Sequence, residues 1–153
     1  MAIPVQIDLQ PQPLERYRDL LGKGFDEIAR VADGARQHLD GRTIWNVNST
    51  ARGGGVAEML RAYLPYVLDG GVDTRWVVLQ EEPEFFRLTK RLHNNFHGDP
   101  GDDGPLGLDE KQFYLESLAD SGDHLTGLVS PEDVVILHDP QTAGLIPAVR
   151  ETG

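Results

Sequence analysis

The chain has 153 residues, 39% of them hydrophobic, which gives room for one domain with a sizeable core. Its formal net charge of −11 comes from 25 acidic against 14 basic residues without a block of Lys or Arg, so nucleic acids and anionic membranes are poor partners. The chain has no cysteine, which excludes disulfides and thiolate metal sites, and without a basic leader or a long apolar run we predict a cytoplasmic protein that enters no membrane.

Strand and helix patterns alternate along the chain. Residues 3–9 alternate as a short edge strand would, until Pro11 and Pro13 break the pattern. A helical region is expected from about residue 14 to 39, and its glycines, Gly22 among them, indicate that it is broken. The later expected elements are strands at 43–48, 74–79 and 134–138, helices at 55–69, after Pro83, at about 109–127 and at 141–150, and a loop at 98–107.

This order predicts an α/β fold with an open, mostly parallel sheet flanked by helices. The apolar run VVILH at 134–138 is typical of a strand buried in such a sheet. Ligands of open parallel sheets bind at the carboxyl ends of strands. The polar stretches 48–55 and 138–141 lie at two such ends, so we expect one crevice to contain both.

The segment IWNVNSTARGGGVAEML at 44–60 predicts a strand, a glycine loop and the start of a helix. The glycines let the backbone turn sharply and approach a ligand, while the first N–H groups of a helix favour an oxygen-rich or anionic group. The alternative is a tight turn that only packs the helix on the sheet. NAD binding is not expected, because Glu58 occupies the third glycine position of the G-x-G-x-x-G pattern. Arg52 either contacts phosphate or is solvated.

The segment NVNSTARGGGVAEML, followed later by VVILHDPQTAGLIP, resembles the N-terminal domain of the retaining glycosyltransferases of family 4 that make or phosphorolyse trehalose. The likeness extends through LERYRDLLG and RWVVLQEEPEFFRLTKRLHNNFHG to nearly the whole chain. It implies a GT-B fold, in which two Rossmann-like domains flank the active site. The first mainly receives the acceptor sugar and the second grips the donor, so a nucleotide-sugar or phosphate is substrate and no cofactor is needed.

The same resemblance implies roles for individual residues. Asp139 would hydrogen-bond hydroxyls of the acceptor, glucose or a related sugar, with His138 and Gln141 beside it, since a carboxylate can accept two hydroxyl protons at once. The alternative for Asp139 is a cap of the following helix. The loop against the donor diphosphate and transferred glucose would consist of Gly53, Gly54 and Gly55, and further candidates are Asn48, Ser49 and Glu58.

The resemblance also implies that something is missing. The chain ends with AVRETG, before the donor-binding basic residues and paired glutamates of the family. We therefore expect 1–153 to be one partial Rossmann-like domain, with an N-terminal strand and helical region (1–41) and a strand and helix core (42–153). It would lack the C-terminal donor-binding domain, hold no complete catalytic set and be inactive alone. The competing interpretation is a non-catalytic sugar- or phosphate-binding or interaction module. An uncovered apolar edge near 134–150 would favour a homo-oligomer.

Two patterns suit metals weakly. His93 and His97 lie four apart on an expected helix, which is compatible with zinc, but no third ligand is evident. The segment 99–110 matches a calcium loop in part, although Gly101 replaces an acidic ligand. We predict no metal site and interpret the segment as an acidic surface loop.

Overall fold

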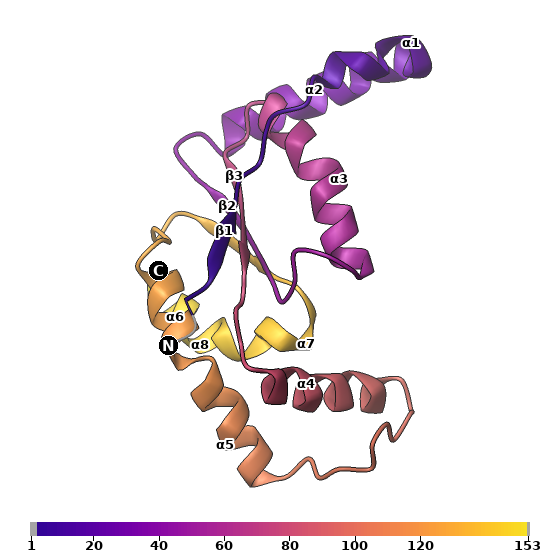
Figure 1. The fold of residues 1–153 in the computed structure, drawn as a ribbon. Helices are drawn as coiled ribbons and strands as arrows, with labels where there is room; N and C mark the ends of the chain where they lie inside the picture. The colour runs from indigo at the N-terminus through magenta and orange to yellow at the C-terminus, as the bar shows by residue number, and fades with distance from the viewer. Residues whose placement is uncertain (1–2, 153) are drawn as a thin grey trace.

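In the computed structural model, which describes residues 3–152, four strands form one open sheet with helices around it (Figure 1). The order in the sheet is β1-β3-β2-β4. Strand β2 pairs in parallel with both β3 and β4, whereas β1 lies antiparallel to β3 at one edge. The expected α/β class, an open and mostly parallel sheet of Rossmann-like kind, is therefore confirmed. The strands are β1 (Val5–Ile7), β2 (Ile44–Asn48), β3 (Thr74–Val78) and β4 (Val134–Leu137).

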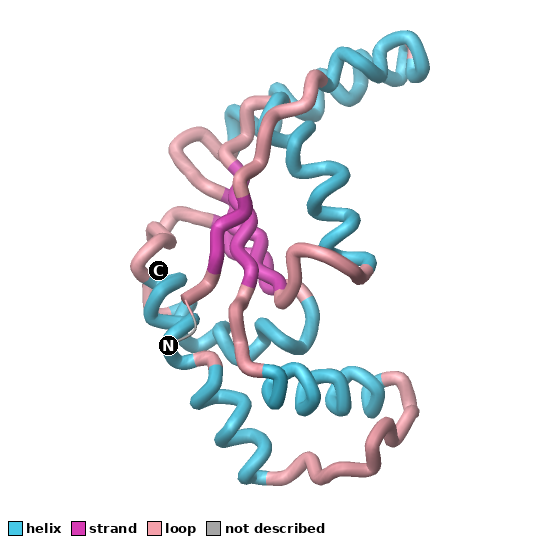
Figure 2. The backbone as a smooth tube through the Cα atoms, viewed as in Figure 1, coloured by secondary structure: helices cyan, strands magenta, loops and turns pink. Residues whose placement is uncertain are grey.

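The N-terminal helical region is broken, as its glycines indicate. The break lies at Gly22, whose φ of +52° is a conformation that L side chains rarely adopt. Helices α3 and α4 each follow a parallel strand at the expected place (Figure 2). The elements of this part are η1 (Leu14–Tyr17), α1 (Arg18–Leu21), α2 (Lys23–His38), α3 (Gly55–Asp69) and α4 (Pro83–Phe96).

Two single helices expected in the C-terminal half are wrong in detail. The segment 109–127 forms α5 (Leu108–Ser117) and α6 (Ala119–Thr126), because a tighter bond from Leu118 N to Leu115 O redirects the chain. The segment 141–150 forms α7 (Asp139–Thr142), η2 (Ala143–Leu145) and α8 (Ile146–Arg150). Pro147 has no N–H to continue the helical ladder there, so the apolar stretch divides into short pieces.

Strand β4 is less buried than its apolar run suggests, but it lies at a sheet edge, as expected for the region 134–150. Among the described residues it pairs only with β2, and Ile136 is 39% exposed. Its composition is typical of a buried parallel strand, but within residues 3–152 its place in the strand order is at an edge.

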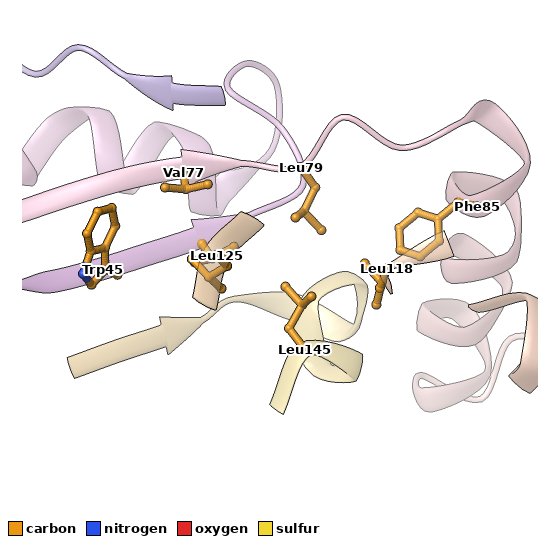
Figure 3. Close-up of a cluster of buried hydrophobic side chains, with 8 residues drawn as sticks. Trp45, Val77, Leu79, Phe85, Leu118, Leu125 and Leu145 are labelled. Carbon is orange, nitrogen blue, oxygen red and sulfur yellow. The ribbon is translucent and has the colours of Figure 1, made fainter. Parts of the chain in front are cut away.

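The core consists of two clusters, one on each face of the sheet. Alternation along β2 directs Trp45 and Val47 to one face and Asn46 and Asn48 to the other. The second face packs on α3 through Ala57, Leu60, Leu64, Trp76 and Val78. Figure 3 shows the first cluster, which consists of Trp45, Val47, Val77, Leu79, Phe85, Leu118, Leu125 and Leu145. The two buried asparagines thus bring polar groups toward the carboxyl edge of the sheet.

In the part of the chain that the structure describes, no helix is both long and apolar enough to cross a membrane.

Candidate functional site

The glycine loop and the turn after β4 meet in one crevice, as the topology of the sheet predicts. Its volume is about 340 Å³. Six of the residues named from the sequence line it, and they are Asn48, Gly53, Gly54, Gly55, Asp139 and Gln141. Ser49, Glu58 and His138 are not among its lining residues.

The glycine loop is held at its start by Asn48. The Asn48 Oδ1 atom accepts a bond from Trp76 Nε1 at 2.8 Å, and its Nδ2 donates to Thr50 O at 2.8 Å. Gly53 and Gly54 then have φ of +70° and +105°, which only glycine adopts readily. This turn aims the start of α3 at the crevice.

The first N–H groups of α3 are unused. Within residues 3–152, the backbone N–H groups of Gly55, Val56 and Ala57 have no hydrogen-bond partner, and all three residues line the crevice. Intrahelical bonding begins with the bond from Glu58 N to Gly54 O at 3.1 Å. Such a helix start carries partial positive charge and is suited to an oxygen-rich group.

The turn after β4 holds Asp139 in an unusual conformation. Its φ is +68°, uncommon outside glycine, although Asp and Asn tolerate it best. The Thr142 hydroxyl lies 2.8 Å from His138 O and 3.2 Å from Asp139 O. His138 occupies the N-cap position of α7. Among the described residues, the Asp139 side chain makes no capping hydrogen bond to this helix. The helix-cap interpretation of Asp139 is therefore wrong, and its exposed carboxylate is available to the crevice.

Gln141 lines the same crevice and carries a buried acceptor. Its Oε1 atom has no hydrogen-bond partner, and within residues 3–152 it is the only buried side-chain N or O atom of which this is true. Buried polar atoms are almost always bonded, so this atom stands out among the described residues.

His138 is held at the side of this turn. Its Nε2 atom lies 3.1 Å from Asn46 Oδ1, and Asn46 Nδ2 donates to Thr74 Oγ1 at 3.2 Å. Burial lowers the pKa of His138, and the nearby Asp139 carboxylate raises it by less. The neutral imidazole is therefore favoured.

Helix α4 contributes a wall that the sequence patterns did not reveal. Lys90 and His93 line the crevice from it, and Thr50 lines it from the glycine loop. The available signal was positional: Lys90 and His93 are three apart, hence on one face, in the helix that follows the strand beside β2. By residue type, the sequence of this helix draws attention only to His93 and His97, whose spacing is compatible with zinc.

The two weak metal patterns do not assemble a cluster. No group of three or more His, Cys, Asp or Glu that could hold a metal ion occurs among residues 3–152. The His93 and His97 rings lie 4.5 Å apart. In the acidic loop, Asp102 binds Arg91 at 2.6 and 3.0 Å, and Glu110 accepts from Gly107 N at 2.8 Å. Arg91 lowers the pKa of Asp102 to about 2.

A family model described as the N-terminal domain of trehalose synthase matches residues 46–153, which include both sides of the crevice. The chain is similar to the trehalose synthase of Pyrococcus horikoshii, with 36% identity over 135 residues that cover 87% of this chain and 30% of that protein. Its identity to the trehalose synthase of Rubrobacter xylanophilus is 34% over 138 residues, 85% of this chain and 30% of that protein. It is also 33% identical to the trehalose phosphorylase of Pleurotus pulmonarius over 144 residues, 90% of this chain and 19% of that protein. The chain thus spans less than a third of the length of these curated relatives.

Proposed function

The chain belongs to the trehalose synthase N-terminal domain family, and on that premise we propose that its crevice is the acceptor side of a glycosyltransferase site. The reaction forms or phosphorolyses trehalose, by moving a glucosyl group between glucose and either a nucleotide-glucose or glucose 1-phosphate. The relatives named trehalose synthase and trehalose phosphorylase support both directions. The crevice accordingly binds a sugar rather than a dinucleotide such as NAD.

The observation that carries this proposal is that Asp139 and Gln141, whose Oε1 atom has no partner, line one crevice with the glycine loop. Leaving a buried acceptor unpaired costs about 1–3 kcal/mol, so an occupant with a hydroxyl donor is favoured. The Asp139 carboxylate lines the same crevice and accepts further hydroxyl protons. A carboxylate and an amide on residues that line one small crevice suit a polyhydroxylated ring.

The opposite wall supports an anionic group. The free N–H groups at the start of α3 and the Lys90 side chain line the crevice together. A helix start and an ammonium group both favour negative charge, as found on the phosphate of a sugar donor. We propose that the sugar lies toward the turn at 139–141 and the phosphate toward residues 53–57.

We further propose that residues 1–153 bind sugar but do not transfer it by themselves. Because the chain spans 30% of the trehalose synthases it matches, most of what those proteins carry lies outside it. A donor-binding part, on the same or another polypeptide, completes the site. The competing function is a non-catalytic sugar- or phosphate-binding module.

Titration of glucose into the isotopically labelled chain tests the sugar site. Amide signals of Asp139, Gln141 and Gly53 should shift together and saturate at one affinity. Gln141→Met removes the acceptor at similar volume and should weaken binding about tenfold, whereas Gln80→Met changes an exposed glutamine outside the crevice and should not. No saturable shift, or shifts confined to other surfaces, would overturn the proposal.

An activity assay then separates the two functions. The chain alone should form no trehalose from nucleotide-glucose and glucose. A longer protein that carries this crevice and a donor-binding part should form it. Sugar binding without transfer in that longer protein would favour the non-catalytic module.

A further inference from the structure

Tyr114 lies outside the crevice, but its hydroxyl holds the turn that carries Asp139 and Gln141. The hydroxyl donates to Pro140 O at 2.6 Å and accepts a bond from Gly144 N at 2.7 Å. Both partners belong to the α7–η2 segment, whereas Tyr114 belongs to α5. The Tyr114 hydroxyl thus bonds the backbone at residue 140, between the crevice residues Asp139 and Gln141, and again at residue 144.

The Tyr114 ring also contacts the opposite wall. It stacks on Phe85, with ring centroids 5.7 Å apart and an angle of 9° between the planes. Phe85 is fully buried in α4, the helix that carries Lys90 and His93. Tyr114 therefore contacts both the turn at 139–141 and the helix opposite it.

Gly144 permits the close approach of the Tyr114 ring to the turn. A Cβ at Gly144 would lie 2.6 Å from Tyr114 Cε1 and 2.8 Å from Leu118 Cδ1, so only glycine lets the ring approach the turn. Burial raises the pKa of Tyr114, which keeps the hydroxyl protonated as a donor. The positive φ of Asp139 is an unfavourable conformation that surrounding contacts must hold.

We infer that Tyr114 is a positioning residue for the proposed sugar site: it holds Asp139 and Gln141 at a set separation from Lys90 and His93. The inference rests on the proposed function only for its effect on ligands. A hydroxyl that bonds two backbone groups at once and a ring wedged against α4 favour this role over simple filling of the core.

Tyr114→Phe in the full chain tests it, because phenylalanine retains the ring stacking and loses only the hydroxyl. We expect hydrogen exchange of the Gly144 amide to quicken about tenfold, amide shifts at Asp139 and Gln141, and about fivefold to tenfold weaker glucose binding. Tyr63→Phe is the matched control, since the Tyr63 hydroxyl on α3 makes no hydrogen bond within residues 3–152 and lies outside the crevice lining. Its amide signals at the turn should match those of the wild type.

The inference is overturned if hydrogen exchange at the Gly144 amide and amide shifts at the turn are no larger than in the control. It is also overturned if the turn is displaced while the glucose affinity stays unchanged. If the wild type itself binds no glucose, the proposed function fails, and the positioning role is decided by exchange and shifts alone. Should Tyr114→Phe not fold, Gly144→Ala keeps the hydroxyl but forces the ring away, and its amide shifts at Asp139 and Gln141 and its glucose affinity decide the matter.

Discussion

The imidazole Nε2 atom of His138, at the end of β4, lies 3.1 Å from Oδ1 of Asn46, a side chain buried in β2. The chain of bonds continues, because Asn46 Nδ2 donates to Thr74 Oγ1 and the Thr74 hydroxyl donates to Ile44 O at 3.2 Å. Since the hydroxyl proton is used on Ile44, Asn46 must turn its oxygen toward His138. The neutral imidazole therefore carries its proton on Nε2.

The pKa of His138 should lie below the ordinary value of 6.5, because burial disfavours the imidazolium more than Asp139 stabilises it. Below pH 6.5 the unfolded chain then binds more protons than the folded one, so this residue reduces stability as pH falls from 6.5 through the folded pKa. NMR titration of the ring gives the pKa directly. Asn46→Asp places a carboxylate beside Nε2 and should raise it, and a wild-type value at or above 6.5 would contradict the prediction.

Gly54→Ala should destabilise the chain through the backbone rather than through a clash. A Cβ there would meet nothing within 4 Å, but the φ of +105° and ψ of 146° are unfavourable for any side chain. We expect a loss of about 1–3 kcal/mol in urea denaturation. Gly55→Ala is the matched variant, since it meets no atom within 4 Å and has no positive φ. Equal losses at the two positions would show that the backbone conformation of Gly54 is not the cause.

Asp139→Asn should weaken sugar binding without disturbing the fold. Asparagine tolerates the φ of +68° as aspartate does, so the substitution isolates the charge. A hydrogen bond to a charged acceptor is worth about 1.5–3 kcal/mol, which predicts about 10- to 100-fold weaker binding of glucose. Calorimetric titration measures the affinity, and the midpoint of thermal unfolding shows whether the fold is unchanged. An unchanged affinity would remove Asp139 from the site.

Periodicity and turn residues sufficed to predict most of the fold. The parallel strands at Ile44–Asn48 and Thr74–Val78 and the helices that follow them lie where expected, because each combines a strong apolar pattern with a clear stop at glycine or proline. The apolar run of strand β4 does not determine how deeply it is buried, since composition reports how apolar a segment is and not which neighbour covers it.

The candidate site was predictable only where backbone chemistry is unusual. The glycine triplet predicts a sharp backbone turn, and Gly53 and Gly54 have positive φ angles. The HDPQ segment predicts polar groups at a strand end. Lys90 and Tyr114 carry no such mark, because a lysine or tyrosine on an amphipathic helix fits a solvated face or a core equally well, and the spacing of His93 and His97 points to a metal instead of to this crevice. Their roles depend on contacts between segments distant in the sequence.

Arg91→Ala should release the loop at 98–107. The Arg91 side chain is only 16% exposed, bonds both oxygens of Asp102 and donates to Pro105 O at 2.6 Å. We expect faster amide exchange and proteolysis across the loop. Arg87→Ala is the control, since the exposed Arg87 lies 3.9 Å from Glu84 and does not bond the loop.

The same pair makes the loop sensitive to strong acid. Arg91 holds the pKa of Asp102 at about 2, below its ordinary 3.8, so the bond contributes fully above 3.8 and is lost as pH falls through about 2. Loop protection should fall over this range in the wild type and vary less in Asp102→Asn. Identical acid profiles of the two proteins would contradict the prediction.

Lys90→Gln should weaken binding of glucose 1-phosphate more than binding of glucose. Lys90 lines the crevice together with Gly55 and Val56, whose N–H groups are free, and it forms no ion pair within residues 3–152, so its charge is available to a phosphate. Loss of one charge-assisted bond predicts about tenfold weaker binding of the sugar phosphate, and the difference should shrink at high salt. Lys111→Gln, on α5 and outside the crevice lining, removes the same charge elsewhere and should leave both affinities near those of the wild type. Equal weakening by the two substitutions would mean that net charge acts at a distance, and equal loss for both ligands would place Lys90 against the sugar instead of the phosphate.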